Sequence, residues 1–449
     1  GCKGVSSPDT GLLAVAAAWT CRLAVMSPRE MATQRPGIIA HRLAAISPVS
    51  LRYRQWACGI GHRASGRADG PVAVCSTDCQ PRSHAVHSHA PTHCSYGHHP
   101  AALSGTFSCP HHPHGARLSG SRTFRTKGLP MHILILGSSG FLGSHITSHL
   151  LLQGHTVRAA VRGTAAGRSP QKGLAHAVWD GVDAAALVPL LHDVDAVINL
   201  QGENIGAGRW TAARKQAIAQ SRLNAGHALT AALQTQHDRG LRLPGTLLQA
   251  SACGYYGLWQ DAATAPDCDE TYPRGQGFLA DVCALWEEST DRAEALGIRR
   301  CVLRFSPVVG QKASGGVGGF LERMLTPFLY FLGGPVGSGR QPMSWVHMSD
   351  VTQAVRFLLE REDVQGIFNI SAPTQVNMRQ FASALGKACS RPSWLPVPGF
   401  VLRLALGQMA EELVLHGQKS LPVRLKLAGY SFQRPDLDEA LVETLRRRA

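Results

Sequence analysis

Gly137-Ser138-Ser139-Gly140-Phe141-Leu142-Gly143 follows directly on the apolar run His132 to Leu136 and opens a helical pattern that continues to Gln153. Glycines with this spacing between a strand and a helix allow a tight turn and let the backbone approach a pyrophosphate. The free N–H groups of the helix amino end then face the phosphates. We predict that these seven residues bind a dinucleotide; a plain glycine-rich turn is the alternative.

The end of the second apolar run decides between the two nicotinamide cofactors. The run Thr156 to Val161 leads into Arg162, and no acidic residue follows before Asp180. NAD sites place a carboxylate at this point to hold the ribose hydroxyls, whereas an arginine can pair with a 2′-phosphate. The sequence therefore predicts NADP, with Arg162 on its phosphate. A solvated loop arginine is the alternative.

Apolar runs of strand length alternate with helical patterns along most of the chain. Such alternation requires right-handed crossovers and a parallel sheet covered on both faces. We predict an α/β fold, a Rossmann-type doubly wound parallel sheet with a smaller, mainly helical C-terminal region on the substrate side. The expected strands are His132 to Leu136, Thr156 to Val161, Ala175 to Trp179, Asp195 to Leu200, Thr246 to Ser251, Cys301 to Phe305 and Gly366 to Ile370, and the segment Met343 to His347 belongs to the same alternation. The expected helices are Phe141 to Gln153, Asp183 to His192, Thr211 to about Leu233, Phe278 to Leu296, Val351 to Glu360, Met378 to Ala388 and Leu402 to Leu415.

The composition separates a leader from the ordered part. Residues 1–130 carry 14 Lys and Arg against 4 Asp and Glu, with 7 of the 12 Cys and 11 of the 21 His. These Cys and His repeat no structural-zinc spacing, so no metal is expected. We interpret the leader as a disordered or untranslated upstream stretch, with the mature chain starting at Met131; an organelle transit peptide is the rival interpretation. The domains expected after it are residues 131–310 for cofactor binding, 311–390 for the substrate side and returning sheet elements, and 391–449 as a small helical domain.

The remaining residues exclude several classes of partner. They hold 31 Lys and Arg against 26 Asp and Glu, a near balance that argues against nucleic acid. No run approaches the ~20 apolar residues of a spanning helix, so no membrane partner is expected. Their five scattered Cys fit free thiols in a reducing compartment. We expect a cytoplasmic protein, or one of an organelle stroma or matrix if the leader is a transit peptide.

Six segments of the chain stand out as motifs: Gly137 to Gly143, Asp195 to Asn204, Arg209 to Lys215, Ser251 to Gly257, Phe278 to Glu287 and Met343 to His347. They are similar to motifs of the YfcH-like epimerase family proteins, atypical extended short-chain dehydrogenases/reductases related to sugar-nucleotide epimerases. The similarity runs from Met131 to about Leu445 and includes that family's small C-terminal domain. It implies an NADP-binding fold with epimerase or oxidoreductase activity.

The resemblance implies further cofactor contacts and an assembly. Asp180 would lie near the adenine, although a turn residue is an equal alternative, and Asn199, Gln201 and Gly202 would flank the ribose and phosphates. The carboxyl ends of parallel strands, where these residues lie, are where a dinucleotide binds. The two helices expected over residues 211–233 and 278–296 form the dimer interface in many such proteins, so a monomer or homodimer is expected.

The expected chemistry lacks its usual pair of residues. Short-chain dehydrogenases use a tyrosine activated by a lysine four residues later, but Leu279 and Cys283 stand at those positions. Cys283 is more simply a small core residue. The catalytic candidates that remain are Ser251, to hold a substrate oxygen, and Tyr255 or Tyr256, to act as an acid if a cation such as Arg304 or the cofactor ring lies close. All three can equally be wall or packing residues.

Two other groups have both a functional and a structural interpretation. His347 is a candidate base, but with Asp350 it more simply positions a helix amino end. The cluster Arg209, Trp210, Arg214 and Lys215 binds an anionic substrate or is a solvated helix face.

Two functions fit the sequence. The first is an NADP-dependent oxidoreductase or epimerase that acts on a small substrate, either linked to a nucleotide or free. The second is a non-catalytic NADP-binding sensor or regulatory protein, because the glycine loop is intact while the tyrosine–lysine pair is missing.

Overall fold

The computed structural model describes residues 129–163 and 171–446. The leader lies outside the described residues, so both interpretations of it stay predictions. Within the described part, no helix combines the length and the apolar character needed to cross a membrane.

A seven-stranded sheet forms the centre of the described region, in the order β11-β7-β5-β4-β1-β2-β3. Every neighbouring pair in it is parallel, which confirms the predicted fold class. The chain moves outward from β1 in both directions, and this reversal of strand order creates the crevice in which such sheets bind ligands. The strands are β1 (His132–Leu136), β2 (Thr156–Val161), β3 (Leu174–Val178), β4 (Ala196–Asn199), β5 (Thr246–Ala252), β7 (Arg299–Phe305) and β11 (Gly366–Ile370).

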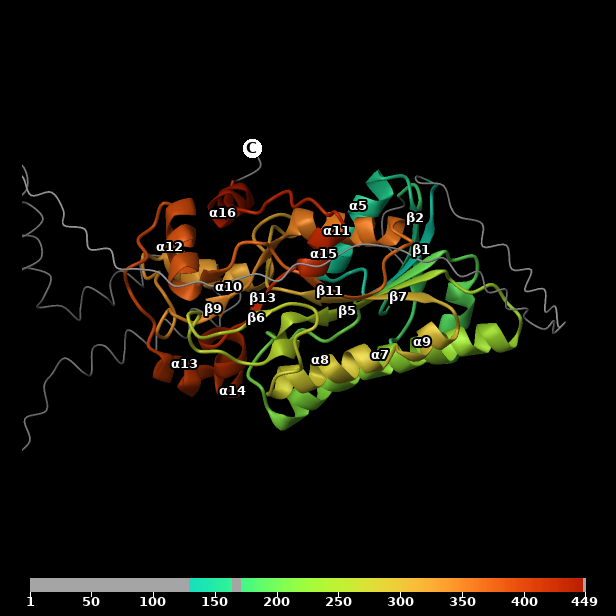
Figure 1. Ribbon diagram of the computed structural model, residues 1–449, viewed down its shortest axis with the longest axis horizontal. Coiled ribbons are helices and arrows are strands. Elements are labelled where there is room, and N and C mark those ends of the chain that lie inside the picture. Colours follow the sequence, from blue (N-terminus) through green and yellow to red (C-terminus); the bar gives the residue numbers. More distant parts are fainter. Residues whose placement is uncertain (1–128, 164–170, 447–449) are drawn as a thin grey trace, which may run out of the picture. The chain divides into compact units, whose positions relative to one another are not determined.

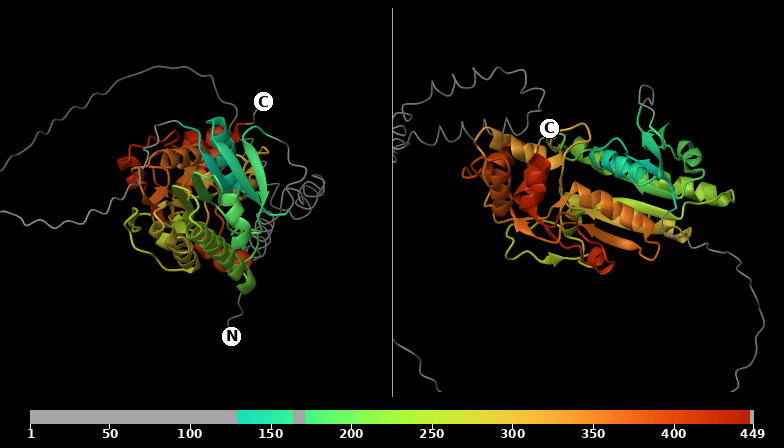
Figure 2. Two further views of the ribbon diagram at one scale, coloured as in Figure 1. Left: turned by 90° about the vertical axis from the view of Figure 1, so that its right-hand side faces the viewer. Right: turned by 90° about the horizontal axis from the view of Figure 1, so that it is seen from above.

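Helices cover both faces of this sheet, as Figures 1 and 2 show. Side chains of β1 alternate between the faces because successive residues of a strand point to opposite sides. Ile133 and Ile135 belong to one buried apolar cluster, and Leu134 and Leu136 to another. One face carries α5 (Phe141–Leu152), α11 (Met348–Glu360) and α15 (Val423–Leu427); the other carries α6 (Ala184–Leu187), α7 (Ala212–Asp238), α8 (Phe278–Glu288) and α9 (Arg292–Ala295).

The helix predicted from Phe278 to Leu296 is interrupted, and that prediction was wrong in its length. Ser289 Oγ donates to the Trp286 carbonyl, and Arg300 Nη1 donates to the Glu287 carbonyl. Side chains that take up main-chain carbonyls in this way compete with the helical ladder. The chain therefore turns after α8 and resumes in the short α9. The helix predicted over residues 183–192 likewise divides into α6 and a 3₁₀ turn, Val188–Leu191.

The C-terminal part adds helices and small sheets at the carboxyl edge of the main sheet. The helix predicted from Leu402 to Leu415 is broken at Gly407, whose φ of +62° does not fit a right-handed helix. The helices are α10 (Gly319–Leu329), α12 (Met378–Ala388), α13 (Gly399–Leu406), α14 (Gln408–Ala410), a π-helical turn (Glu411–Leu415) and α16 (Leu437–Leu445). The two-stranded sheets pair β8 (Val308–Val309) with β10 (Val346–His347), β9 (Pro342–Met343) with β12 (Val376–Asn377), and β6 (Asp267–Cys268) with β13 (Lys419–Ser420).

Candidate functional site

The glycine loop between β1 and α5 is packed so closely that side chains do not fit at two of its glycines. Gly137 has φ of +82°, and a Cβ atom there would lie 3.0 Å from the Leu200 carbonyl carbon. A Cβ atom on Gly143 would lie 2.2 Å from the Gly137 carbonyl oxygen. The loop thus brings the end of β1, the start of α5 and the chain after β4 into contact, as a phosphate-binding turn requires.

The amino end of α5 is open to an anion. Gly140 is the N-cap, no side chain accepts from the first turn, and that turn holds no acidic residue. The N–H groups of Phe141, Leu142 and Gly143 belong to this turn, where main-chain donors have no partner within the helix. Ser138 is buried and its hydroxyl donates to the Ala160 carbonyl, whereas Ser139 is exposed. These residues fit the pyrophosphate of a dinucleotide.

Arg162 and Asp180 follow β2 and β3 at the same edge of the sheet. The Arg162 side chain is 66% exposed, and its Nη1 lies 3.7 Å from Glu203 Oε2, a loose contact that leaves the guanidinium accessible. Asp180 Oδ1 accepts from the N–H groups of Val182 and Asp183, which lowers the pKa of this exposed carboxyl. Asp180 thus forms a turn, and its place near an adenine stays a prediction.

The segment after β4 is held by Asn199. This residue is fully buried; its Nδ2 donates to Gln249 Oε1 at 2.9 Å, and its Oδ1 accepts from the Gln201 N–H at 3.2 Å. The amide therefore fixes the loop that carries Gln201 and Gly202. The Arg222 guanidinium lies against Gly202, where a Cβ atom would come within 2.9 Å of Cζ.

A buried polar network joins β5, β7 and α8. Ser251 Oγ donates to Glu287 Oε1 at 2.6 Å, and Arg304 makes a bidentate pair with Glu287 through Nε and Nη2, both at 2.8 Å. Arg304 Nη1 also donates to the Tyr256 hydroxyl at 3.1 Å, and that hydroxyl donates to Asn369 Oδ1 at 2.7 Å. Burial raises the pKa of Tyr256 well above its ordinary value. Within this network the Tyr256 hydroxyl both donates and accepts a hydrogen bond, and the Ser251 hydroxyl donates its only proton.

Tyr255 differs from its neighbour. Its ring lies over Arg304, with 3.4 Å between Cζ and the ring centroid, so a cation lies close to this tyrosine, which was the condition for its role as an acid. The side chain is partly exposed, and its hydroxyl makes no hydrogen bond within the part of the chain that the structure describes.

The two residues that replace the tyrosine–lysine pair lie on one face of α8. A Cβ atom on Gly254 would lie 3.2 Å from Leu279 Cβ and 3.9 Å from Cys283 Sγ. Cys283 is buried, and burial, with Glu287 nearby, raises the pKa of its thiol to about 11. A thiol with that pKa stays protonated at neutral pH, which supports the core interpretation of Cys283.

His347 and Asp350 hold the amino end of α11. The His347 ring accepts from the Ser349 N–H, as a helix N-cap does. Asp350 is buried and accepts from the Tyr430 hydroxyl and the Gln433 N–H. The geometry matches the structural interpretation of this pair.

The basic cluster is held by neighbouring elements and is not simply a solvated face. Arg214 Nη1 donates to Glu203 Oε1, Lys215 Nζ donates to Gln408 Oε1, and Trp210 is buried against Phe278. Whether it also binds an anion stays a prediction.

Glu412, from the C-terminal region, is a further residue of this region that no sequence pattern predicts. Its carboxylate is buried and accepts from the N–H groups of Phe278 and Leu279, at 3.1 and 2.8 Å. An acid at a helix amino end is stabilising, and here it anchors the start of α8. No local pattern marks this role, because 133 to 134 residues separate the partners along the chain.

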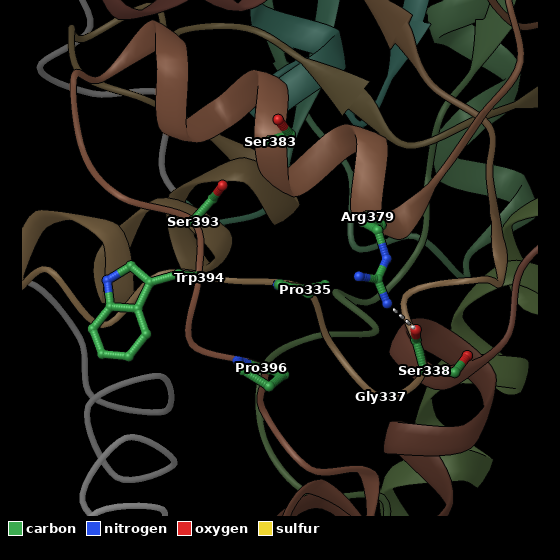
Figure 3. Close-up of a pocket in the computed structure, with 8 residues that line it drawn as sticks. All are labelled: Pro335, Gly337, Ser338, Arg379, Ser383, Ser393, Trp394 and Pro396. Atoms are coloured by element: carbon green, nitrogen blue, oxygen red, sulfur yellow. Dashed lines mark hydrogen bonds between the residues drawn. The ribbon is translucent and has the colours of Figure 1, made fainter.

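A separate cavity of about 320 Å³ lies between α12 and the loops beside it (Figure 3). Arg379, on α12, donates to the Ser338 carbonyl across it. None of the predicted site residues lines this cavity, and its lining holds no acid–base pair. The lining residues are Pro335, Gly337, Ser338, Arg379, Ser383, Ser393, Trp394 and Pro396.

The parallel sheet with its glycine loop and open helix end defines a dinucleotide-binding protein of the Rossmann class. Residues 133–371 match the model of the NAD dependent epimerase/dehydratase family, and residues 397–444 match a domain of unknown function, DUF1731. The chain belongs to this NAD(P)-binding epimerase family.

Relatives and solved structures agree with this family. The chain is 37% identical to the epimerase family protein YfhF of Bacillus subtilis, over 70% of this chain and 98% of that protein. It is 31% identical to the chloroplastic SDR39U1 homolog of Arabidopsis thaliana, over 76% of this chain and 97% of that protein. The crystal structure of human SDR39U1 with NADPH superposes with a TM-score of 0.59 at 29% identity, over 70% of this chain and 99% of that one. The narrower YfcH-like grouping rests on the motifs alone.

Proposed function

We propose that this protein is an NADP(H)-dependent oxidoreductase or epimerase of the short-chain dehydrogenase superfamily, acting on a small substrate. The observation that carries the proposal is the glycine loop, whose Gly137 and Gly143 leave no room for side chains while the amino end of α5 stays uncapped. The NADPH in the human SDR39U1 structure supports the choice of cofactor. When bound, the nicotinamide would supply the hydride.

The residues at the carboxyl edge of the sheet would bind the cofactor in order along it. The main chain of Gly140 to Gly143 would hold the pyrophosphate, Arg162 the 2′-phosphate, and the loop fixed by Asn199 the ribose. Asp180, Gln201 and Gly202 would complete this site. The N–H groups in the first turn of α5 and the Arg162 guanidinium are accessible for these roles. Asn199 acts through the loop that its hydrogen bonds hold in place.

Tyr255 is the proposed proton donor and acceptor. Among the three candidates, its hydroxyl makes no hydrogen bond to the described residues, whereas those of Ser251 and Tyr256 do. Ser251 donates its single proton to Glu287, so it can only accept from a substrate hydroxyl. Ser251 is thus proposed to bind the alcohol form of the substrate, and Tyr256 to hold the network beneath it.

A second function is favoured by Leu279 and Cys283. They occupy the positions of the acid–base pair and cannot replace it, which is what a non-catalytic NADP-binding sensor or regulatory protein would show. Such a protein would bind the cofactor without turning over any substrate.

The proposed assembly is a monomer or a homodimer. The elution volume in size-exclusion chromatography, together with light scattering, would distinguish the two.

Calorimetry of the full chain with NADP(H) and NAD(H) tests the cofactor proposal first. We expect selective binding of NADP(H); a folded chain that binds neither cofactor contradicts both functions. Two assays across a substrate panel then separate enzyme from sensor. A reductase transfers deuterium from labelled NADPH to a carbonyl substrate, which mass spectrometry detects. An epimerase passes a hydride from the substrate to NADP⁺ and back, so with NADP⁺ present its measurement is inversion of the substrate stereocentre, and not net cofactor consumption. Tyr255→Phe should abolish both signals, and Ser251→Ala should weaken substrate binding.

A further inference from the structure

Arg222 is fixed between two elements beside the carboxyl edge of the sheet. Its Nη1 donates to the carbonyls of Ile218, at 2.8 Å, and Glu203, at 3.2 Å. The Trp286 ring lies 4.8 Å from Cζ, and Gly202 faces the guanidinium. A guanidinium that is stacked and hydrogen-bonded in this way has lost most of its freedom before any ligand arrives, so it can bind with little further ordering cost.

One edge of this guanidinium is unused. Nε and Nη2 donate to no residue of the described part of the chain, while Nη1 makes both printed hydrogen bonds. A Cβ atom on Gly202 would lie 2.9 Å from Cζ, 3.1 Å from Nη2 and 3.2 Å from Nε, so Gly202 packs over the face of the guanidinium and does not pair with this edge. Arginine has only donors, and these two can pair with two neighbouring oxygen atoms.

The position of this guanidinium, against Gly202, indicates which half of the dinucleotide lies nearest to it. Arg162 follows β2, on one side of β1, whereas Gly202 follows β4, on the other side. A dinucleotide lies across this switch point with its pyrophosphate at α5. If the 2′-phosphate lies at Arg162, the nicotinamide half lies on the side of β4 and β5.

Arg222 also stands beside the residue that replaces the usual lysine. Cys283 lies on α8, one turn before Trp286, whose ring lies 4.8 Å from Arg222 Cζ. Arg222, on α7, therefore places a positive charge near the position on α8 where the usual lysine is missing. Unlike a buried lysine, an arginine keeps its proton at any ordinary pH.

We propose that Arg222 binds the hydroxyl oxygens of the nicotinamide ribose through Nε and Nη2, as the cation of a site that lacks the tyrosine–lysine pair. This role rests on the proposed NADP(H) binding. It also explains why position 202 is glycine, because a side chain there would displace the guanidinium.

Two ligands separate the halves of the cofactor in a calorimetric test. NADPH carries the nicotinamide ribose, whereas adenosine 2′,5′-bisphosphate carries the 2′-phosphate and lacks that ribose. We expect Arg222→Gln to weaken NADPH binding about 10- to 100-fold, the loss of one or two charged hydrogen bonds, and to leave bisphosphate binding unchanged. Arg222→Lys should be intermediate. Arg162→Ala should weaken both ligands.

Retained bisphosphate binding also shows that the Arg222→Gln chain is folded. Arg239→Ala, at the exposed carboxyl end of α7, is the matched control and should bind both ligands as the unaltered chain does. Unchanged NADPH binding by Arg222→Gln, or equal weakening of both ligands, overturns the role of Arg222. Failure of the unaltered chain to bind either ligand overturns the cofactor site itself and this role with it.

Discussion

Glu287 on α8 and Arg304 on β7 form a buried bidentate ion pair, with Nε to Oε1 and Nη2 to Oε2 both at 2.8 Å. Removing one partner of such a pair leaves an uncompensated charge away from water. The pair therefore binds the helix that carries Cys283 to the strand beneath Tyr255.

Glu287→Gln should lower the free energy of unfolding by about 3 to 5 kcal/mol, because Arg304 stays buried without its counter-charge. Urea unfolding measures the change. The control is Glu294→Gln, which breaks the more exposed pair of Glu294 with Arg300 and should cost about 0 to 1 kcal/mol. Equal costs for the two variants would contradict a special contribution from the buried pair.

Arg162→Ala should weaken NADP(H) binding about 10- to 100-fold and spare NAD(H), because only NADP carries the phosphate that the exposed guanidinium would meet. Calorimetric titration with both cofactors measures the difference. Equal loss of both would show that Arg162 does not select the phosphate. Lys172→Ala, an exposed neighbour, serves as the charge-matched control.

Gly143→Ala should unfold or strongly destabilise the loop, because the new Cβ atom would lie 2.2 Å from the Gly137 carbonyl oxygen. Overpacking of this kind costs about 1 to 3 kcal/mol or more. Gly140→Ala is the control, since its Cβ atom would lie 3.3 Å from the same oxygen. Thermal unfolding of both variants should rank Gly143→Ala as the less stable, and the reverse order would refute the packing argument.

Glu412→Gln should loosen the start of α8, at a cost of about 0.5 to 2 kcal/mol, because the charged acceptor of two main-chain donors is lost. Hydrogen exchange at the amides of Phe278 and Leu279 should become faster. Glu411→Gln changes the adjacent carboxylate, which pairs with the exposed Arg403, and should leave that exchange rate as it was. Unaltered exchange in Glu412→Gln would exclude the capping role.

The stability should fall as the pH falls from 7 toward 5.5, in part through His347. Burial lowers the pKa of this imidazole, Arg434 acts in the same direction, and Glu443 and Asp350 act against them. The unfolded chain therefore takes up the proton at a higher pH than the folded chain does. The contribution of the neutral imidazole to the stability is complete above about pH 6.5 and is lost as the pH falls below that value. His149 contributes with the same sign.

His347→Asn keeps an N-cap but removes the titrating group, so its melting temperature should change less with pH over this window. Melting curves of both chains at a series of pH values measure the difference. Equal slopes would show that His347 makes no contribution.

The fold was predictable because periodicity and the glycine loop are local signals. The bounds of β1, β2, β11 and α12 agree with the predicted strands and helix, since each strand is a short apolar run and the buried residues of α12 recur at helical spacing. The helix ends were less predictable. The break after α8 depends on Arg300, a residue of the following strand, whose side chain takes up the Glu287 carbonyl.

The sequence by itself determined the doubly wound sheet, the glycine loop between β1 and α5, and the arginine at the end of β2. Only the tertiary structure decided which polar groups remain available at the site. Ser251 and Tyr256 are committed to a network with Glu287 and Arg304, Tyr255 is not, and Arg222 reaches Gly202 and Trp286 from another helix. The physical reason is that strand and helix patterns depend on neighbours in the chain, whereas the satisfaction of a hydrogen-bonding group depends on partners that folding brings together from far along it.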